Sequence, residues 1–275
     1  MLKSICLIVF ALICRPVFSQ DWKAELLLGG SGYFGDLNEN SFQWQTIRPA
    51  VNVNLKYRLG TQLYLRSGLA WGMTAGNDKN NVDSSLYLRN LSFQTSITEL
   101  NIGLEYLLFN PDLFDQSYPY VFAGVGVFHF NPSAKDMNNE KVFLQPLSTE
   151  GQGLPEYPNK KQYKRVQLCI PMGGGVTFAF SENLDLSAEL GFRKLFTDYF
   201  DDVSTTYPDN ETLSYRKGAT AAEMSYRGLY NHTQNSPPPP DGTIRGNSEK
   251  KDWYYFFGLK LSWRLGNRDR FGDPY

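Results

Sequence analysis

The last apolar segment of the chain, Trp253–Arg264, alternates between two kinds of side chain with a period of two residues. One face is aromatic, then aliphatic, then aromatic again, whereas the other face carries Lys260 and Arg264. A two-residue period is that of a β-strand, and an apolar face with aromatic ends is typical of a wall between hydrocarbon and a polar interior. This segment therefore predicts one strand of a transmembrane β-barrel.

Seven further segments share this pattern or a weaker form of it. Each reaches the roughly 9–11 residues that a tilted strand needs to cross the hydrocarbon layer, and the total is even, as in bacterial outer-membrane barrels. We therefore predict an all-β fold, an eight-stranded antiparallel transmembrane β-barrel. The predicted strands are Trp22–Ser31, Arg48–Leu59, Thr61–Met73, Ile97–Phe109, Tyr118–Phe130, Tyr163–Phe180, Asn183–Phe196 and Asp252–Leu265.

The connections between these strands alternate between long and short along the whole chain. This predicts short periplasmic turns and long extracellular loops, with the first strand starting in the periplasm. The fourth long loop contains four consecutive prolines, so we expect residues 231–241 to form no sheet ladder. The long connections are Gly32–Ile47, Thr74–Ser96, Asn131–Gln162 and Thr197–Lys251; the short ones are Gly60, Asn110–Ser117 and Ser181–Glu182.

The N-terminal residues 1–19 are typical of a signal peptide, with Lys3 before an apolar core and a short apolar segment before Gln20. Lipidation of Cys14 is a less favoured alternative. We predict three parts: the signal peptide (1–19), an outer-membrane barrel (20–265) and a periplasmic C-terminal tail (266–275). Removing Lys3 and Arg15 changes the formal charge from −1 to −3, which argues against a nucleic-acid partner.

In the predicted strands whose alternation is clearest, every charged residue falls on the face that we assign to the lumen. Both signs are present there, so the charges can neutralise one another, and eight strands enclose only enough space for side chains. We therefore predict a plugged lumen, whereas Trp22, Trp71, Trp253, Tyr255 and Trp263 form aromatic girdles. The predicted interior charges are Lys56, Arg58, Arg66, Glu99, Glu105, Asp185, Glu189, Arg193, Lys260 and Arg264.

Two of the predicted strands have a less certain register. In 118–130 both faces are apolar, because aromatic residues alternate with Val and Ala. In 163–180 we expect a bulge at Pro171, which has no backbone N–H to donate to a ladder.

The sequence contains little that points to catalysis or to a cofactor. His129 lies between two phenylalanines with no legible nucleophile or acid partner, so we interpret it as a packed or interfacial residue rather than a general base. Asp198, Asp201 and Asp202 lack the spacing of a dedicated Ca²⁺ loop. We predict no enzymatic activity, no metal site and no cofactor.

Several blocks of the chain resemble one family, the small outer-membrane barrels of Bacteroidetes related to the barrel component of the Por (type IX) secretion and gliding machinery. The signature residues are Thr197, Asp198, Tyr199, Asp201 and Asp202, within Phe196–Ser204. The other blocks are Glu189–Arg193, Tyr118–Phe128, Thr98–Leu100, Glu105–Tyr106, Arg245–Asn247 and Asp252–Tyr254.

The resemblance implies a non-enzymatic outer-membrane subunit that contacts a periplasmic ring, built from a lipoprotein and its partner protein. The segments available for that contact are the predicted turn 110–117 and the tail 266–275. A narrow channel for small solutes, and a general structural or adhesion barrel, remain alternatives.

Overall fold

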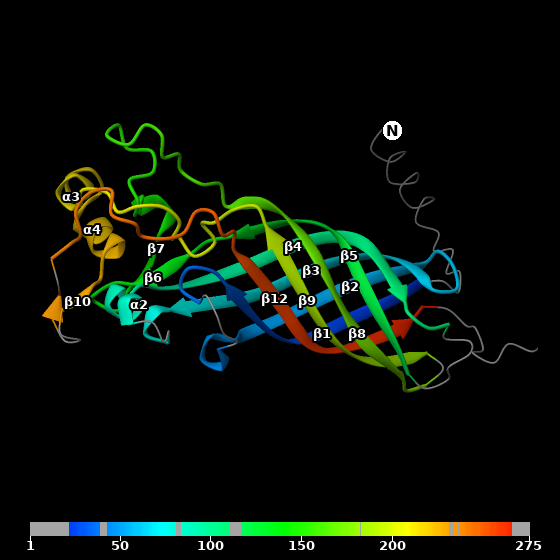
Figure 1. Ribbon diagram of the computed structural model, residues 1–275. Helices are drawn as coiled ribbons and strands as arrows, with labels where there is room; N and C mark the ends of the chain where they lie inside the picture. Colours follow the sequence, from blue (N-terminus) through cyan, green and yellow to red (C-terminus); the bar gives the residue numbers. More distant parts are fainter. Residues whose placement is uncertain are drawn as a thin grey trace, which may run out of the picture.

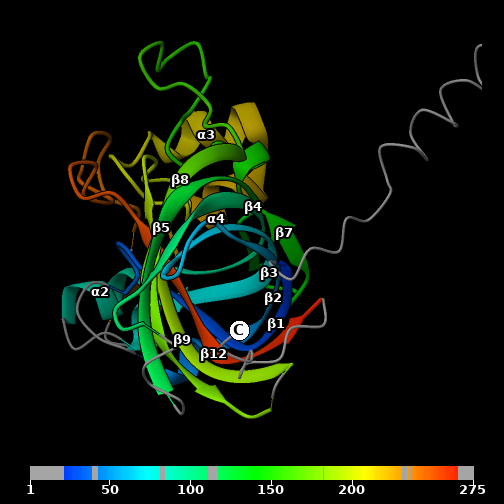
Figure 2. The same ribbon diagram turned by 90° about the vertical axis from the view of Figure 1, so that its right-hand side faces the viewer.

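Eight antiparallel strands close into a barrel, seen from the side in Figure 1 and along its axis in Figure 2. The computed structural model describes residues 22–38, 43–80, 84–110, 117–181, 183–230, 234–235 and 237–265, so the predicted signal peptide and C-terminal tail lie outside the described residues. Each strand pairs with its neighbour along the ring, and the β3–β4 pairing completes the closure. The strands are β1 (Trp22–Phe34), β2 (Arg48–Arg58), β3 (Leu63–Asn77), β4 (Ser92–Leu107), β5 (Ser117–Phe130), β8 (Val166–Ala179), β9 (Leu184–Leu195) and β12 (Trp253–Arg264). The predicted fold class is therefore confirmed.

Additional elements cover the extracellular end of the barrel, on the left in Figure 1. We call this part the cap; it is built from the connections after β1, β3, β5 and β9. Asp209 begins α3 by accepting a hydrogen bond from the Thr212 amide (2.7 Å), and Gly218 (φ +94°) separates the two longest helices. The cap elements are η1 (Trp44–Thr46), η2 (Asp78–Asn80), α2 (Ser84–Arg89), β6 (Ser133–Lys135), β7 (Lys141–Phe143), η3 (Gln145–Leu147), α3 (Asn210–Lys217), α4 (Ala219–Ser225), β10 (Leu229–Tyr230) and β11 (Gln234–Asn235).

The strand boundaries differ from the predicted ones mainly on the extracellular side. The β3–β4 hairpin continues to Asn77 and Ser92, and β6 adds to the edge of β4 through the pair Gln94–Ser133. The expectation that residues 231–241 form no ladder is wrong for β11, which pairs with β10 ahead of the prolines. The sheet therefore extends beyond the membrane-spanning part and supports the cap.

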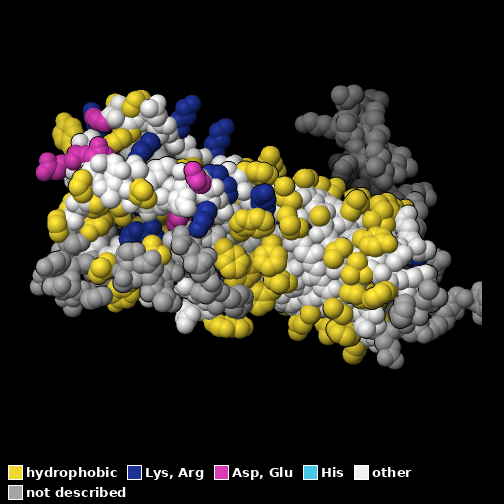
Figure 3. All heavy atoms as spheres, viewed as in Figure 1, with side chains coloured by type: hydrophobic (Ala, Val, Ile, Leu, Met, Phe, Trp, Pro, Cys, Tyr) yellow, Lys and Arg dark blue, Asp and Glu magenta, His cyan; other side chains and the backbone are white. Residues whose placement is uncertain are grey.

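Exposed apolar side chains cover the outer wall of the barrel, and Figure 3 shows those on one face. This apolar band consists of alternate strand residues whose side chains point away from the lumen, such as Leu100, which is 64% exposed to solvent outside the barrel. The neighbouring positions Glu99 and Asn101 are buried in the lumen. Other exposed members of the band are Leu28, Leu69, Val125, Leu168, Leu259 and Leu261. No helix within the described ranges is long and apolar enough to cross a membrane.

Strand β5 turns its aromatic face inward. Tyr120, Phe122 and Phe128 are buried, whereas Val121 and Val125 are exposed on the outer face. This settles a register that the sequence left ambiguous.

The expected bulge at Pro171 is corrected. The β5–β8 pairs Ala123–Met172 and Gly126–Cys169 share one register, so no extra residue is inserted between them. The ladder toward β5 is merely interrupted beside Pro171, because proline lacks the N–H donor.

Candidate functional site

The middle of the lumen holds a neutral network of three acidic and three basic side chains. Lys56 binds Glu25 at 2.7 Å and Glu105 at 2.6 Å. Lys260 binds Glu189 at 2.7 Å and Glu25 at 3.3 Å. Each of these groups is buried, so each charge depends on a partner of opposite sign.

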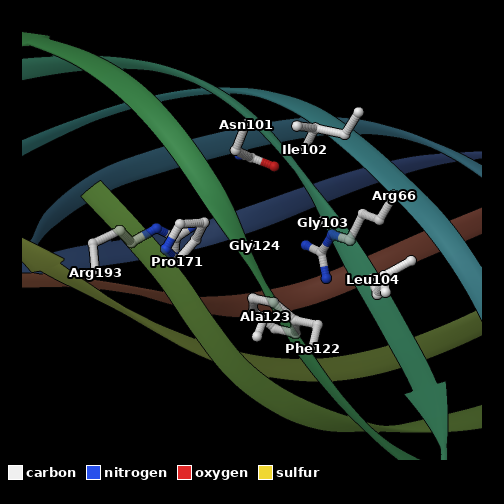
Figure 4. Close-up of a pocket in the computed structure, with 10 residues that line it drawn as sticks. All are labelled: Arg66, Asn101, Ile102, Gly103, Leu104, Phe122, Ala123, Gly124, Pro171 and Arg193. Atoms are coloured by element: carbon white, nitrogen blue, oxygen red, sulfur yellow. The ribbon is translucent and has the colours of Figure 1, made fainter. Parts of the chain in front are cut away.

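Arg66 extends this network across the full width of the barrel. Its strand, β3, lies four strands from β9 in either direction around the ring, and its guanidinium donates two hydrogen bonds to Glu189 on β9, of 3.0 and 2.6 Å. Figure 4 shows Arg66 beside Phe122, whose ring centroid lies 4.2 Å from the guanidinium carbon. The pocket drawn there, which Arg193 also lines, has a volume of only about 10 Å³, about the size of one water molecule.

Two further ion pairs lie toward the ends of this network. Arg193 binds Glu99 at 3.0 Å, and the Tyr254 hydroxyl donates to the same carboxylate at 2.6 Å. Near the periplasmic end, Lys23 binds Asp185 at 2.9 Å. The described lumen thus contains buried charges along most of its length.

Aromatic rings of the inward face of β5 contribute to the same network. The Lys260 ammonium lies 4.5 Å from the centroid of the Tyr120 ring, and the Tyr120 hydroxyl donates to Glu189 at 2.7 Å. Aromatic faces attract cations, which explains why an apolar face can point into a charged lumen.

The structure places eight of the ten predicted interior charges in this buried set and brings them into ion pairs. Arg58 and Arg264 are only half-buried at the periplasmic end, and Arg58 donates to the Gly60 carbonyl at 3.0 Å instead of entering the lumen. Lys23 and Glu25 were not predicted. The alternation of β1, with Ala24 and Leu26 on the opposite face, was the signal that would have identified them.

Phe200 closes the extracellular mouth of the lumen. Its side chain is fully buried and stacks on Tyr254 with ring centroids 5.4 Å apart. Phe130 and Tyr33, on two other strands, lie at centroid distances of 5.5 and 6.0 Å. The connection after β9 therefore places an aromatic plug directly above the charged network.

Above this plug, Arg245 and Glu150 join two of the cap connections. The Arg245 guanidinium binds the Glu150 carboxylate at 3.0 Å and also donates to the Asp202 carbonyl at 2.5 Å. Glu150 accepts further bonds from the amides of Ser204 (2.8 Å) and Thr205 (2.9 Å). Burial alone would lower the pKa of Arg245, but Glu150 and Asp202 more than offset this effect and hold it above its usual value.

Arg89 ties the remaining connections to this pair. It binds Asp78 with two hydrogen bonds of 2.8 Å, and it donates to the carbonyls of Arg245 (2.6 Å) and Asp36 (2.8 Å). All four extracellular connections are therefore held in one hydrogen-bonded cap.

The signature residues lie in this layer, between the aromatic plug and the cap. Asp201 accepts a hydrogen bond from the Tyr33 hydroxyl at 2.8 Å, and Asp202 accepts one from the Tyr163 hydroxyl at 2.7 Å. The Tyr199 hydroxyl donates to Glu150 at 3.1 Å, while Thr197 and Asp198 are buried close by. The signature thus joins the mouth of the barrel to the cap.

Burial changes the acidity of these carboxyl groups. It raises the pKa of Asp198 to about 7 and, despite the opposing effect of Arg245, that of Asp202 to about 6. Burial also raises the pKa of Asp201 and Asp252 well above the usual range, and neighbouring carboxylates add to the effect. Sequence reasoning missed Glu150 and Arg89, because no local pattern pairs them with residues so distant in the chain.

A family model described as "Domain of unknown function (DUF6089)" matches residues 2–227, which is most of the chain. The chain belongs to the DUF6089 family. No curated protein matches it. Its apolar outer band and charged, closed lumen place this DUF6089 barrel in the outer membrane of a Gram-negative bacterium.

Among solved structures, the chain is similar to small outer-membrane proteins at low sequence identity. Neisserial surface protein A is 9% identical, with a TM-score of 0.43, covering 88% of this chain and 96% of that one. Ail, the attachment invasion locus protein of Yersinia pestis, is 8% identical with a TM-score of 0.41 over 89% and 99% of the two chains. OprG from Pseudomonas aeruginosa is 9% identical with a TM-score of 0.39 over 90% and 97%.

The predicted girdle residues of this DUF6089 barrel differ in their surroundings. Trp71 and Trp263 are exposed on the outer wall, and Trp22 and Trp253 are half-buried. Tyr255 corrects the prediction, since it is only 1% exposed and packs against Phe34 at a centroid distance of 5.1 Å. The extension of β1 beyond its predicted end brings Phe34 over Tyr255.

His129 points outward from β5 and is exposed, flanked across the ladder by Thr98 and Val166. It makes no hydrogen bond within the described part of the chain. The described residues also contain no group of three or more His, Cys, Asp or Glu that could hold a metal ion.

Proposed function

We propose that this protein is a non-enzymatic, non-conducting outer-membrane barrel that serves as a structural or anchoring subunit of the type IX secretion machinery. A non-conducting barrel is supported by the bidentate Arg66–Glu189 pair, which crosses the lumen beneath the Phe200 plug. A barrel without an open path acts through its surfaces, since neither transport nor catalysis has a place inside it.

The second part, the secretion role, is supported by the resemblance of the signature block Phe196–Ser204 and its companion blocks to barrels of that machinery. The partner would be a periplasmic ring of a lipoprotein and its companion protein. The tail 266–275, with Arg268, Asp269, Arg270 and Asp273, is the segment that we propose for this contact.

Co-purification after mild detergent extraction tests this proposal. The tagged full-length barrel should bring down the ring lipoprotein, and a variant ending at residue 265 should lose it while still inserting as a barrel. Arg245→Ala serves as the matched control, because it disturbs only the cap and should retain the ring. Recovery of the barrel alone, together with normal secretion in a deletion strain, would refute the secretion role.

A second candidate is an outward interaction, as in an adhesion barrel. It is favoured by the cap, in which Arg89 and Arg245 fix all four connections as one folded surface. In that case Arg245→Ala would abolish attachment of cells to host or bacterial surfaces, whereas removal of residues 266–275 would leave attachment unchanged.

A further inference from the structure

A pocket of about 310 Å³ lies at the extracellular end of the β3–β4 hairpin, where the hairpin meets β6 and β7. Asn77 and Gln94 line it, and they occupy the strand faces that carry the exposed Trp71 and Leu100 further toward the membrane. Alternate residues of a strand share a face, and the six residues from Trp71 to Asn77 advance the strand by about 20 Å. The pocket therefore lies beyond Trp71 and outside the apolar band, on the outward-facing side of the barrel wall.

The lining of this pocket is basic. It includes Arg48, Lys135 and Lys141 and no acidic residue. Lys135 and Lys141 are direct partners in the β6–β7 ladder, where like charges opposite each other are unfavourable, so an anion bound between them would relieve this repulsion. Neither lysine makes an ion pair with any described residue.

The other groups around the pocket are amides and hydroxyls, from residues such as Asn77 and Gln94, which suit sugar hydroxyls. On the face seen in Figure 3, basic side chains are spread over the cap as far as its border with the apolar band. The charge and the position thus favour an anionic ligand held at the membrane surface.

We propose that this pocket binds the phosphorylated head group of an outer-leaflet glycolipid. Its size falls within the range of roughly 300–1,000 Å³ that is usual for ligand sites. Lys135 and Lys141 would bind the phosphate, and Arg48 would face the sugar. A lipid is favoured over a free anion because the wall of the pocket continues directly into the lipid-facing strand surface. The binding is independent of any secretion partner.

Native mass spectrometry of the purified full-length barrel tests the proposal, with doubly phosphorylated lipid A and its dephosphorylated form as probes. We expect lipid A to bind about tenfold more tightly than the dephosphorylated form. The double variant Lys135→Gln, Lys141→Gln should lose that preference. The charge-retaining pair Lys135→Arg with Lys141→Arg should keep it, which separates loss of charge from misfolding. Arg216→Gln with Lys217→Gln removes two positive charges from α3 and should leave binding within about twofold of wild type.

Three results would overturn the proposal. The first is equal affinity for lipid A and its dephosphorylated form. The second is unchanged lipid A binding in the variant with Lys135→Gln and Lys141→Gln. The third is displacement of bound lipid A by inorganic phosphate as effective as displacement by free lipid A. The last result would instead identify a site for a soluble anion.

Discussion

Arg66 and Glu189 join opposite walls of the barrel through two hydrogen bonds of 3.0 and 2.6 Å. Both side chains are buried, and Glu189 is shared with Lys260 at 2.7 Å. The interaction therefore crosslinks the lumen and occupies it at the same time.

Removing one partner of this pair should destabilise the barrel. Arg66→Met leaves the network one positive charge short, and an uncompensated buried charge costs about 3–5 kcal/mol. Adding Glu189→Gln to Arg66→Met should restore part of the loss, because it removes the unpaired charge. Urea unfolding in lipid vesicles measures both free energies of unfolding. Equal stability of the wild type and Arg66→Met would show that the network does not hold the barrel together.

Phe200→Ala should open the mouth of the lumen. The substitution removes a fully buried ring from a cluster that includes Tyr254, so we expect a loss of about 3–5 kcal/mol from the packing of the cap. Hydrogen exchange of the amides in residues 197–204 reports this loss locally. Tyr215→Ala is the control, since Tyr215 is 85% exposed on α3 and its loss should leave exchange unchanged. Equal protection in both variants would exclude a plugging role for Phe200.

Arg245→Ala should loosen the cap without unfolding the barrel. It removes the ion pair with Glu150 and the bond to the Asp202 carbonyl, and it leaves Glu150 buried with its charge only partly compensated. Limited proteolysis should then cleave the cap connections much faster while the strands stay protected. Arg216→Ala breaks the exposed pair with Glu156, worth about 0–1 kcal/mol, and should not change the cleavage rate. Cleavage of the barrel strands in Arg245→Ala would contradict a separable cap.

The cap should be more stable in mild acid than in mild base. Burial raises the pKa of Asp198 to about 7 and of Asp202 to about 6, from a usual value of 3.8. A raised pKa means that folding favours the protonated group, so this contribution is fully present below the usual pKa and is lost as pH rises through about 6 and about 7. Asp36 and Glu150 add to the shift at Asp198, whereas Ser204 and Lys251 oppose it.

Cap unfolding by urea at about pH 5 and about pH 8 measures this dependence. Asp198→Asn should weaken it, because the amide stays neutral at both values, while Asp202 keeps its own contribution. A cap that becomes more stable as pH rises would contradict the raised pKa values of Asp198 and Asp202.

Much of the barrel was predictable from alternation, because the membrane imposes one polarity on each face. Leu55 and Lys56, adjacent in β2, separate to the outer wall and the lumen as their pattern indicates. In β5 the rule is ambiguous, because Phe122 and Val121 are both apolar. The aromatic face points inward, where Arg66 and Lys260 contact the rings of Phe122 and Tyr120. Polarity alone therefore does not determine the register of such strands.

The cap could not be predicted in the same way. Glu150 and Arg245 are 95 residues apart and meet only because the barrel brings the ends of its strands together. Nothing in the sequence indicated that Asp201 and Asp202 would be buried, each accepting a hydrogen bond from a tyrosine hydroxyl, of Tyr33 and Tyr163 respectively. The pairing of Lys135 with Lys141 likewise depends on the β6–β7 hairpin, whose strands are too short to show a periodic pattern in the sequence.

Conductance of the purified full-length barrel in a planar lipid bilayer tests the central claim most directly. With the lumen filled by ion pairs from Lys23–Asp185 to Arg193–Glu99 and closed by Phe200, the inserted wild-type barrel should show no steady current. A stable, ohmic open channel in the wild-type protein would contradict the account.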